Sequence, residues 1–117
     1  MHNMVVEILM IVRAYSPYDD VDKAYRLKHP TPITARGNHC SEHPYGIAAF
    51  LPDYPRGTVI SVPGYNDEKA TSVDDTGGSI RKAQREGKPV WIEVRFKTQA
   101  EAVKWGCKTI KVRITYP

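Results

Sequence analysis

The sequence lacks a long hydrophobic run, a secretion signal and a cysteine framework, and each absence excludes a class of protein. The longest uninterrupted apolar stretch covers residues 8–12, far fewer than the roughly 20 that a membrane-spanning helix needs, so we expect no membrane span. The N-terminal segment has no basic region followed by a long apolar core and a small-residue cleavage site, so we expect no signal peptide and synthesis in the cytoplasm. Two cysteines, Cys40 and Cys107, are too few for a disulfide framework, and the sequence leaves open whether they pair.

Charge is only mildly one-sided. The 117 residues include 17 Lys and Arg against 13 Asp and Glu, a formal net charge of +4, which suits polyanions such as an anionic cell-wall polymer. The basic residues are not interleaved with aromatic ones in the manner of single-strand binders, so we expect no nucleic acid as a partner. A hydrophobic content of 41% with 26% charged residues is typical of one soluble globular domain, which we place at residues 1–117.

Short alternating or apolar segments dominate the chain. Nine prolines and eight glycines, against one clear helical pattern, indicate a mainly β fold. The expected strands are residues 5–14, 46–50, 58–62, 69–74, 90–96 and 109–116. The first is apolar over most of its length, which predicts burial on much of both faces. The fifth alternates, with Ile92 and Val94 on the core face and Trp91, Glu93 and Arg95 on the other.

One short helix is expected near the C-terminus and one long loop in the N-terminal half. Thr98 followed three residues later by Glu101 forms a capping box, and Gly106 suits the position after the last helical residue. Residues 16–45 are polar and proline-rich, and we interpret them as a loop with one short helical turn at residues 21–27. Such a long loop in a compact domain is more often functional than idle. Five or six strands with one helix predict a small closed barrel.

Several motifs together resemble a known family. The most characteristic is Asp-Thr-Gly-Gly-Ser-Ile at residues 75–80, and the second is Ile-Glu-Val-Arg-Phe at residues 92–96. The other matches are Ala14-Tyr15-Ser16, Thr-Ala-Arg-Gly at residues 34–37, Pro-Arg-Gly-Thr at residues 55–58, and Ala102, Gly106, Ile110 and Val112. This pattern, over roughly residues 10–115, resembles the three-aspartate domain of the membrane-bound lytic transglycosylase A and stationary-phase survival protein type.

The resemblance implies a six-stranded double-psi β-barrel of the rare lipoprotein A-like superfamily. For the enzymatic members it also implies cleavage of the peptidoglycan glycan strand, with no cofactor. The family's three aspartates fall near position 51, at 75 and at 93. Asp75 is present, and Glu93 keeps the carboxyl group but moves it out by one methylene. The first position is Leu51, so either Asp53 replaces that aspartate or the role is lost.

The implied chemistry needs one carboxyl group that acts first as an acid and then as a base. It protonates the glycosidic oxygen, and the resulting carboxylate removes the proton of the sugar's own 6-hydroxyl, which closes a 1,6-anhydro ring. By resemblance Glu93 is this catalytic group, and Asp75 is the neighbouring charge that keeps it protonated or stabilises the oxocarbenium-like transition state. The residues expected to bind substrate are Asp53, Tyr15, Thr34, Thr76, Gly77, Gly78, Lys82 and Trp91. Residues 81–90, which are rich in Lys and Arg, are expected to form a basic flap beside the site.

Plainer interpretations of the same residues stay open. The Asp-Thr-Gly-Gly string is also typical of a solvated turn, and Glu93 of an exposed strand residue paired with Arg95 or a lysine. Asp74 is interpreted as the outward-facing neighbour of Asp75, because successive strand residues point to opposite faces. Trp105 lies on the apolar side of the helix and is expected in the core.

The loop at residues 29–43 raises the question of a metal. Imidazole and thiolate are good zinc ligands, and Cys40 and His43 have a ligand-like spacing. With His29 and His39 nearby but no second close pair, we expect no metal, and a structural zinc at His39, Cys40 and His43 is the alternative. Cys107 is expected to be a small buried residue.

The expected setting follows from this function and from the absent leader. A wall-degrading protein made without a secretion signal is typical of a phage lysin or a virion-associated component. The alternative is a barrel that binds glycan without cutting it, as expansin-like domains do, or a structural barrel in a phage tail. A third class, a nucleic-acid-binding barrel, rests only on net charge and predicts a steep salt dependence.

Overall fold

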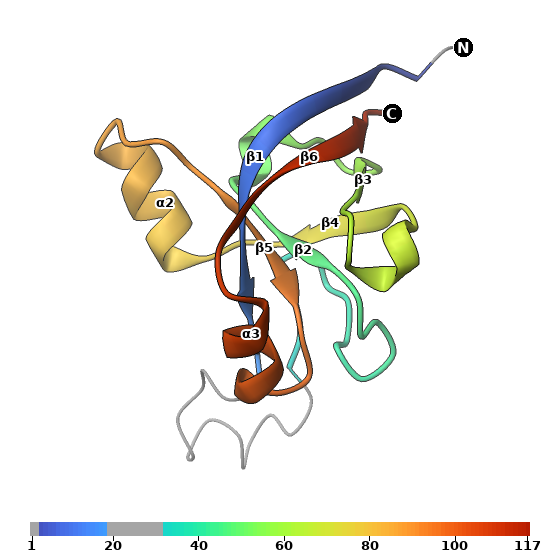
Figure 1. Cartoon of the computed structure of the whole chain (residues 1–117), viewed down its shortest axis with the longest axis vertical. Helices are drawn as coiled ribbons and strands as arrows, with labels where there is room; N and C mark the ends of the chain where they lie inside the picture. The colour runs from blue at the N-terminus through green and yellow to red at the C-terminus, as the bar shows by residue number, and fades with distance from the viewer. Residues whose placement is uncertain (1–2, 19–31) are drawn as a thin grey trace.

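The computed structural model describes residues 3–18 and 32–117, and this part of the chain is mainly β with two α-helices. The strands are β1 Val5–Tyr15, β2 Ile47–Ala48, β3 Val59–Ser61, β4 Thr71–Asp75, β5 Ile92–Arg95 and β6 Lys108–Thr115. Their order in the sheet is β1-β5-β2-β4-β3-β6, and β6 pairs again with β1, so the sheet closes into a barrel (Figure 1). The pairs β1/β5 and β2/β4 are parallel, and the others are antiparallel. The mainly β fold is confirmed, whereas the helical turn expected at residues 21–27 lies outside the described residues.

Alternate residues of the strands fill the barrel interior. Ile92 and Val94 of β5, and Val112 and Ile114 of β6, are at most 3% exposed, as their alternation predicts. The core cluster consists of Val12, Ile47, Ala49, Tyr54, Ile60, Val62, Tyr65, Val73, Ile92, Val94, Trp105, Val112 and Ile114. Because the even positions of β5 point into this core, its odd positions, including Glu93, point to the outside of the barrel.

The N-terminal half of β1 does not have the burial that its apolar sequence predicts. Val5 is 54% exposed and Leu9 67% exposed, and full burial is reached only at Val12. The reason is topological: β1 pairs with β6 from Val5 onward but joins β5 only from Val12. The first residues of β1 therefore have a strand partner on one side only, β6, and β6 is in turn paired with β3 at residues 113–115 (Figure 1). The prediction of a strand buried on both faces is wrong for this half.

Two helices follow strands β4 and β5. Helix α3, Gln99–Trp105, begins at the predicted cap, where the Thr98 hydroxyl accepts a hydrogen bond from the Glu101 backbone N–H, and ends at Gly106 with a positive φ of 74°. Helix α2, Gly78–Arg85, occupies the segment expected to be a basic flap, so the prediction of a single helix is wrong. Only Ile80 and Ala83 of α2 are buried. Two apolar positions three residues apart are a weak helical signal next to a glycine pair.

Tyr65 packs in the core, and its hydroxyl hydrogen-bonds to the backbone of two separate segments, at Gly46 and at Arg95. Its ring is 2% exposed, and its hydroxyl donates to the Arg95 carbonyl at 2.6 Å and accepts from the Gly46 N–H at 3.0 Å. Burial raises the pKa of Tyr65 to about 12, and burial likewise raises the pKa of Tyr54 to about 12. Both hydroxyls therefore keep their protons in the folded protein at pH values where an unfolded tyrosine loses its own.

We expect the stability of the protein to fall between about pH 10 and pH 12. The pKa of each tyrosine is higher in the folded than in the unfolded protein. The stability that each protonated hydroxyl contributes is therefore fully present below about pH 10 and is lost as the pH rises through the folded-state pKa. The loss is at most about 2–3 kcal/mol for each tyrosine. Denaturant unfolding at several pH values measures it. The Tyr65→Phe variant should be less stable at neutral pH but lose less stability on going to pH 12, and an equally steep loss in that variant would contradict the assignment.

Candidate active site

The two carboxyl groups that the sequence singles out flank one residue of the shortest strand. Ala48 of β2 is the partner of Asp75 in β4 on one side and of Glu93 in β5 on the other. Adjacent strands lie about 4.8 Å apart, so the backbones of Asp75 and Glu93 are about 10 Å apart. An irregularity in the register between Ile47 and Ala48 accompanies this alignment. Asp75 and Glu93, 18 positions apart in the chain, thus belong to one stretch of the barrel surface.

The carboxylate of Asp75 is held by three hydrogen-bond donors. The Tyr15 hydroxyl donates to Oδ2 at 2.8 Å, and the backbone N–H groups of Ala35 and Thr76 donate to Oδ1 at 3.0 and 2.9 Å. Burial raises the pKa of Tyr15 well above its ordinary value, and the negative charge of Asp75 raises it further. Tyr15 therefore stays protonated and acts as a donor that fixes the orientation of Asp75.

Asp74 lies on the outer face of β4, as the sequence-based interpretation has it, but it is buried there. It is 2% exposed, and its two oxygens accept hydrogen bonds from Nη1 and Nη2 of Arg95 at 2.8 and 3.0 Å. The Asn38 side chain donates a further bond at 3.0 Å. Alternation does place Asp74 on the face away from the core residue Val73, but the loop containing Asn38 covers that face. The alternation of the strand indicates the face on which Asp74 lies, but not the loop that covers this face.

Arg95 connects the two neighbouring aspartates. Its Nη1 also donates to the Tyr15 hydroxyl at 3.2 Å, and Tyr15 in turn donates to Asp75. Its Nη2 donates to the carbonyls of His43 and Tyr45 at 2.6 and 3.1 Å. Burial acts to lower the pKa of Arg95, but its hydrogen bonds to Asp74 and Tyr15 outweigh burial and raise it above the ordinary value. A permanent buried cation therefore orders this side of the site.

Glu93 is on the same strand as Arg95, β5, but its side chain belongs to a different cluster, with Trp91 and Arg13. The indole N–H of Trp91 donates to Oε2 of Glu93 at 2.8 Å, and the Arg13 guanidinium lies 4.1 Å from the centre of the Trp91 ring. Arg13 is also the strand partner of Glu93 across the β1/β5 pair. Glu93 is half-buried. The Trp91 and Arg13 side chains thus restrict where the Glu93 carboxyl group can point.

Thr34 and the residues that follow Asp75 take up different positions around it. Thr34 is 5% exposed, and its hydroxyl accepts from the Asn38 N–H at 3.0 Å, so it shapes the loop from the inside. Thr76 binds Asp75 through its backbone, and Gly77 and Gly78 lead into α2. A Cβ atom at either glycine would meet only ordinary van der Waals contacts, at 3.7 and 3.9 Å, so a small side chain would fit at both positions without a clash.

Two other predicted substrate-binding residues are directed elsewhere. Lys82 is exposed on α2, where its Nζ lies 3.9 Å from Glu86 Oε1. Asp53 is exposed at the end of the short 3₁₀ helix η1, Leu51–Asp53. Asp75 receives its hydrogen bonds from Tyr15, Ala35 and Thr76 and not from η1. The network around Asp75 therefore forms without a contribution from Asp53.

Sequence reasoning missed the structural role of Arg95 and of a second arginine, Arg36. Nη1 of Arg36 donates to the Val73 carbonyl at 2.9 Å, and Nη2 donates to the carbonyls of Leu51 and Tyr54, which ties the loop to β4 and η1. Burial lowers the pKa of Arg36, and the charge of Arg56 lowers it further. Two features of the sequence could have indicated the role of Arg95. It lies at an outward position of a strongly alternating strand, and two consecutive aspartates end another strand.

The cysteine and histidine residues of the loop do not form a metal centre in the described structure. Among residues 3–18 and 32–117, no group of three or more His, Cys, Asp or Glu side chains is placed to hold a metal ion, and His29 lies outside those residues. Cys40 is buried and free, and burial raises the pKa of its thiol. Cys107 is free and exposed, so its expected burial is wrong.

Comparison with protein-family models, with curated proteins and with solved structures gives no match to this chain. In the part of the chain that the structure describes, no helix has the length and apolar character needed to cross a membrane. The fold and the side-chain geometry therefore carry the functional argument.

Proposed function

We propose that this protein cleaves peptidoglycan glycan strands by a lytic transglycosylase mechanism, on a barrel of the double-psi type. The barrel type is supported by the two parallel pairs, β1/β5 and β2/β4, in an otherwise antiparallel closed barrel of six strands. The observation that carries the proposal is that Ala48 is the strand partner of both Asp75 and Glu93. Carboxyl groups on either side of one strand suit a glycosidic bond, whose cleavage needs acid catalysis at oxygen and stabilisation of positive charge at carbon.

Glu93 is the acid and then the base in this mechanism. Its carboxyl group gives a proton to the glycosidic oxygen while the bond from that oxygen to the anomeric carbon breaks. The resulting carboxylate then takes the proton of the 6-hydroxyl of the same sugar, and the 6-oxygen bonds to the anomeric carbon. The hydrogen bond from the Trp91 indole to Oε2 orients the Glu93 carboxyl group.

Asp75 supplies negative charge for the oxocarbenium-like transition state. Its carboxylate is fixed by Tyr15, Ala35 and Thr76 before substrate arrives. A charge that needs no reorientation during the reaction stabilises the transition state more effectively than one that must move. Gly77 and Gly78 follow Asp75 closely in the chain and carry no side chain, so a sugar could approach their backbone.

Glycan binding without cleavage is the alternative function, and the Arg13–Trp91–Glu93 cluster favours it. A half-buried indole with a fixed polar edge is a common sugar-stacking surface. In that case Glu93 would serve to hold Trp91 in place rather than to transfer a proton. The two functions differ in what replacement of Glu93 by glutamine does.

The test is incubation of the protein with purified peptidoglycan, followed by mass spectrometry of the soluble fragments. We expect 1,6-anhydro muropeptides from the wild type and a loss of their release by about 10²–10⁴-fold in Glu93→Gln, because glutamine cannot transfer the proton. Glu68→Gln, a matched change at an exposed residue of the 3₁₀ helix η2, Asn66–Glu68, should release products at the wild-type rate.

Three results would contradict the mechanism. Unchanged release of anhydro products by Glu93→Gln would remove Glu93 from catalysis. Reducing-end products would identify a hydrolase, in which water rather than the 6-hydroxyl attacks. Sedimentation of the protein with peptidoglycan without any product, and equally for Glu93→Gln, would establish the binding function instead.

A further inference from the structure

Two hollows beside helix α3 share lining residues and form one continuous groove. The inner hollow, about 210 Å³, is lined by Tyr18, Cys40 and Ser41 together with the shared residues. The outer hollow, about 520 Å³, extends over Tyr45 and Trp105. The shared residues are Pro44, Arg95, Phe96 and Lys97. We call the combined hollow the β5–α3 groove.

The floor of the β5–α3 groove is aromatic and rigid. Tyr45, 51% exposed, packs edge-on against buried Tyr65 with ring centres 5.4 Å apart. Tyr65 packs against Phe96 at 5.5 Å, and Phe96 packs against Trp105 at 6.0 Å. The Trp105 indole N–H is fixed by the Val12 carbonyl at 3.2 Å. An apolar ligand surface would therefore meet a floor that needs little reorganisation.

The rim of the groove is positively charged. Among the described residues that line it, Lys97, Lys104 and Lys108 are exposed and basic, and Glu101 is acidic. Lys108 Nζ lies 3.8 Å from the centre of the Trp105 ring, so one of these charges sits directly over the aromatic floor. The charge of Arg95 is matched by Asp74 and does not add to this excess. Charge complementarity therefore favours an acidic ligand.

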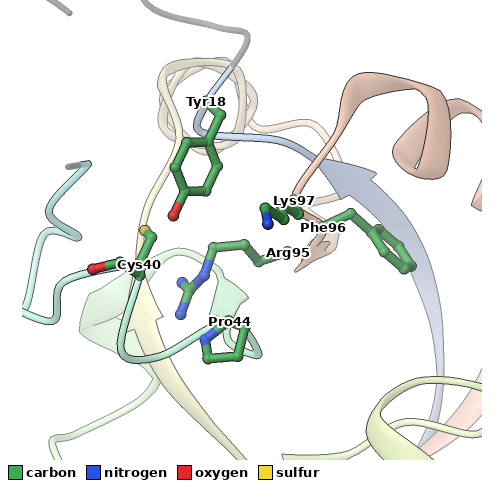
Figure 2. A pocket seen from close by; sticks show the side chains of 7 residues that line it. Tyr18, Cys40, Pro44, Arg95, Phe96 and Lys97 are labelled. Atoms are coloured by element: carbon green, nitrogen blue, oxygen red, sulfur yellow. The ribbon is translucent and has the colours of Figure 1, made fainter. Parts of the chain in front are cut away.

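The inner end of the groove contains an unused hydrogen-bond donor. Arg95 is 2% exposed, and within the described residues its Nε is a buried side-chain atom with no hydrogen-bond partner. Figure 2 shows the Arg95 side chain extending into the middle of this hollow, with Pro44 and the thiol of Cys40 beside the guanidinium. A buried donor without a partner costs stability. Because this Nε atom is closed off from the hollow, a ligand at this end would meet Tyr18, Cys40 and Pro44 rather than a free charge.

The groove lies in line with the proposed catalytic residue. Glu93, Arg95 and Lys97 are alternate residues along β5 and its continuation, so successive members are spaced by about 7 Å. A glycan whose scissile bond lies at Glu93 would place a side branch toward Arg95 and then Lys97. In peptidoglycan that branch is the short peptide on muramic acid, which carries carboxylates and the small methyl groups of alanine.

We propose that the β5–α3 groove binds this acidic stem peptide, with its carboxylates at the lysine rim and its alanine methyl groups on the aromatic floor. The inference rests on the proposed function for the identity of the peptide. It assigns the groove to the substrate's peptide and the Glu93–Asp75 surface to its glycan. The protein thereby selects strands that still carry their peptides.

The test is a titration of the full chain carrying Glu93→Gln with a synthetic L-Ala-γ-D-Glu-L-Lys-D-Ala peptide, followed by NMR amide shifts. We expect shifts at Tyr45, Lys97 and Trp105. Each of Lys97→Gln, Lys104→Gln and Lys108→Gln should weaken binding by about two- to fivefold, and the three together by about tenfold or more. Converting the peptide carboxylates to amides should weaken it similarly. The control Lys111→Gln, at an exposed lysine of β6 that lies outside the groove, should leave the affinity unchanged.

The outcomes separate this inference from the proposed function. Equal binding of the peptide and its amidated form, no binding at all, or tighter binding of a single-stranded oligothymidylate would overturn the groove assignment. Peptide binding by a protein whose wild type releases no anhydro products would support the groove and refute glycan cleavage. Equal release from peptide-bearing and peptide-free strands, by the wild type and the triple lysine variant alike, would refute the groove and leave cleavage standing.

Discussion

Replacing Asp74 with asparagine is expected to lower the free energy of unfolding by about 3–5 kcal/mol, because it leaves the Arg95 cation buried without a counter-charge. Both side chains of this pair are at most 3% exposed, and their closest N–O distance is 2.8 Å. Asparagine has nearly the same size as aspartate, so the substitution creates no cavity. The loss of unfolding free energy therefore measures the charge and hydrogen bonding of Asp74. Chemical denaturation monitored by tryptophan fluorescence measures it.

The chain offers a matched control for this prediction. Glu7 and Arg113, strand partners in the β1/β6 pair, form a carboxylate–guanidinium pair at the same 2.8 Å distance, but their side chains are 48% and 61% exposed. Solvent screens such a pair, so Glu7→Gln should leave the unfolding midpoint close to that of the wild type. Similar losses in Asp74→Asn and Glu7→Gln would show that burial does not determine the strength of the Asp74–Arg95 pair.

The features that sequence reasoning captured are those that depend on neighbouring residues alone. The alternation of β5 places Ile92 and Val94 in the core, and the capping box at Thr98 starts α3. Both follow from local backbone geometry, which the order of side chains reveals directly. For the same reason the presence of six strands could be predicted, whereas α2, with only two apolar positions, could not.

The features that it missed depend on what packs against a strand from elsewhere in the chain. Asp74 is buried because the loop containing Asn38 lies over the outer face of β4, and Val5 and Leu9 are exposed because this part of β1 pairs with β6 and not with β5. Alternation distinguishes the two faces of a strand but does not say what covers each of them. Likewise, Asp75 accepts a hydrogen bond from Tyr15 and Glu93 accepts one from Trp91, and the register through β2 relates the two carboxyl groups.

Replacing Gly46 with alanine is expected to cost about 3 kcal/mol or more, because the added methyl group would occupy the space of the Arg95 guanidinium. A Cβ atom at Gly46 would lie 2.3–2.4 Å from three atoms of that group. The guanidinium cannot move away without breaking its bonds to Asp74 and Tyr15 and to the carbonyls of the neighbouring loop. Thermal or denaturant unfolding measures the cost, and displacement of Tyr15 should also reduce release of anhydro products.

The steric origin of this cost can be separated from a general effect of glycine replacement. Gly78→Ala makes the same change at the start of α2, where the new methyl group meets nothing closer than 3.9 Å, and alanine favours a helix by up to about 1 kcal/mol. Gly78→Ala should therefore be neutral or stabilising. In an Arg95→Met background the guanidinium is absent, so the additional cost of Gly46→Ala should shrink by at least about half. If the cost of Gly46→Ala is unchanged in that background, the clash does not involve the Arg95 guanidinium. Arg95 would then not be the fixed centre of the Asp74–Tyr15–Asp75 network.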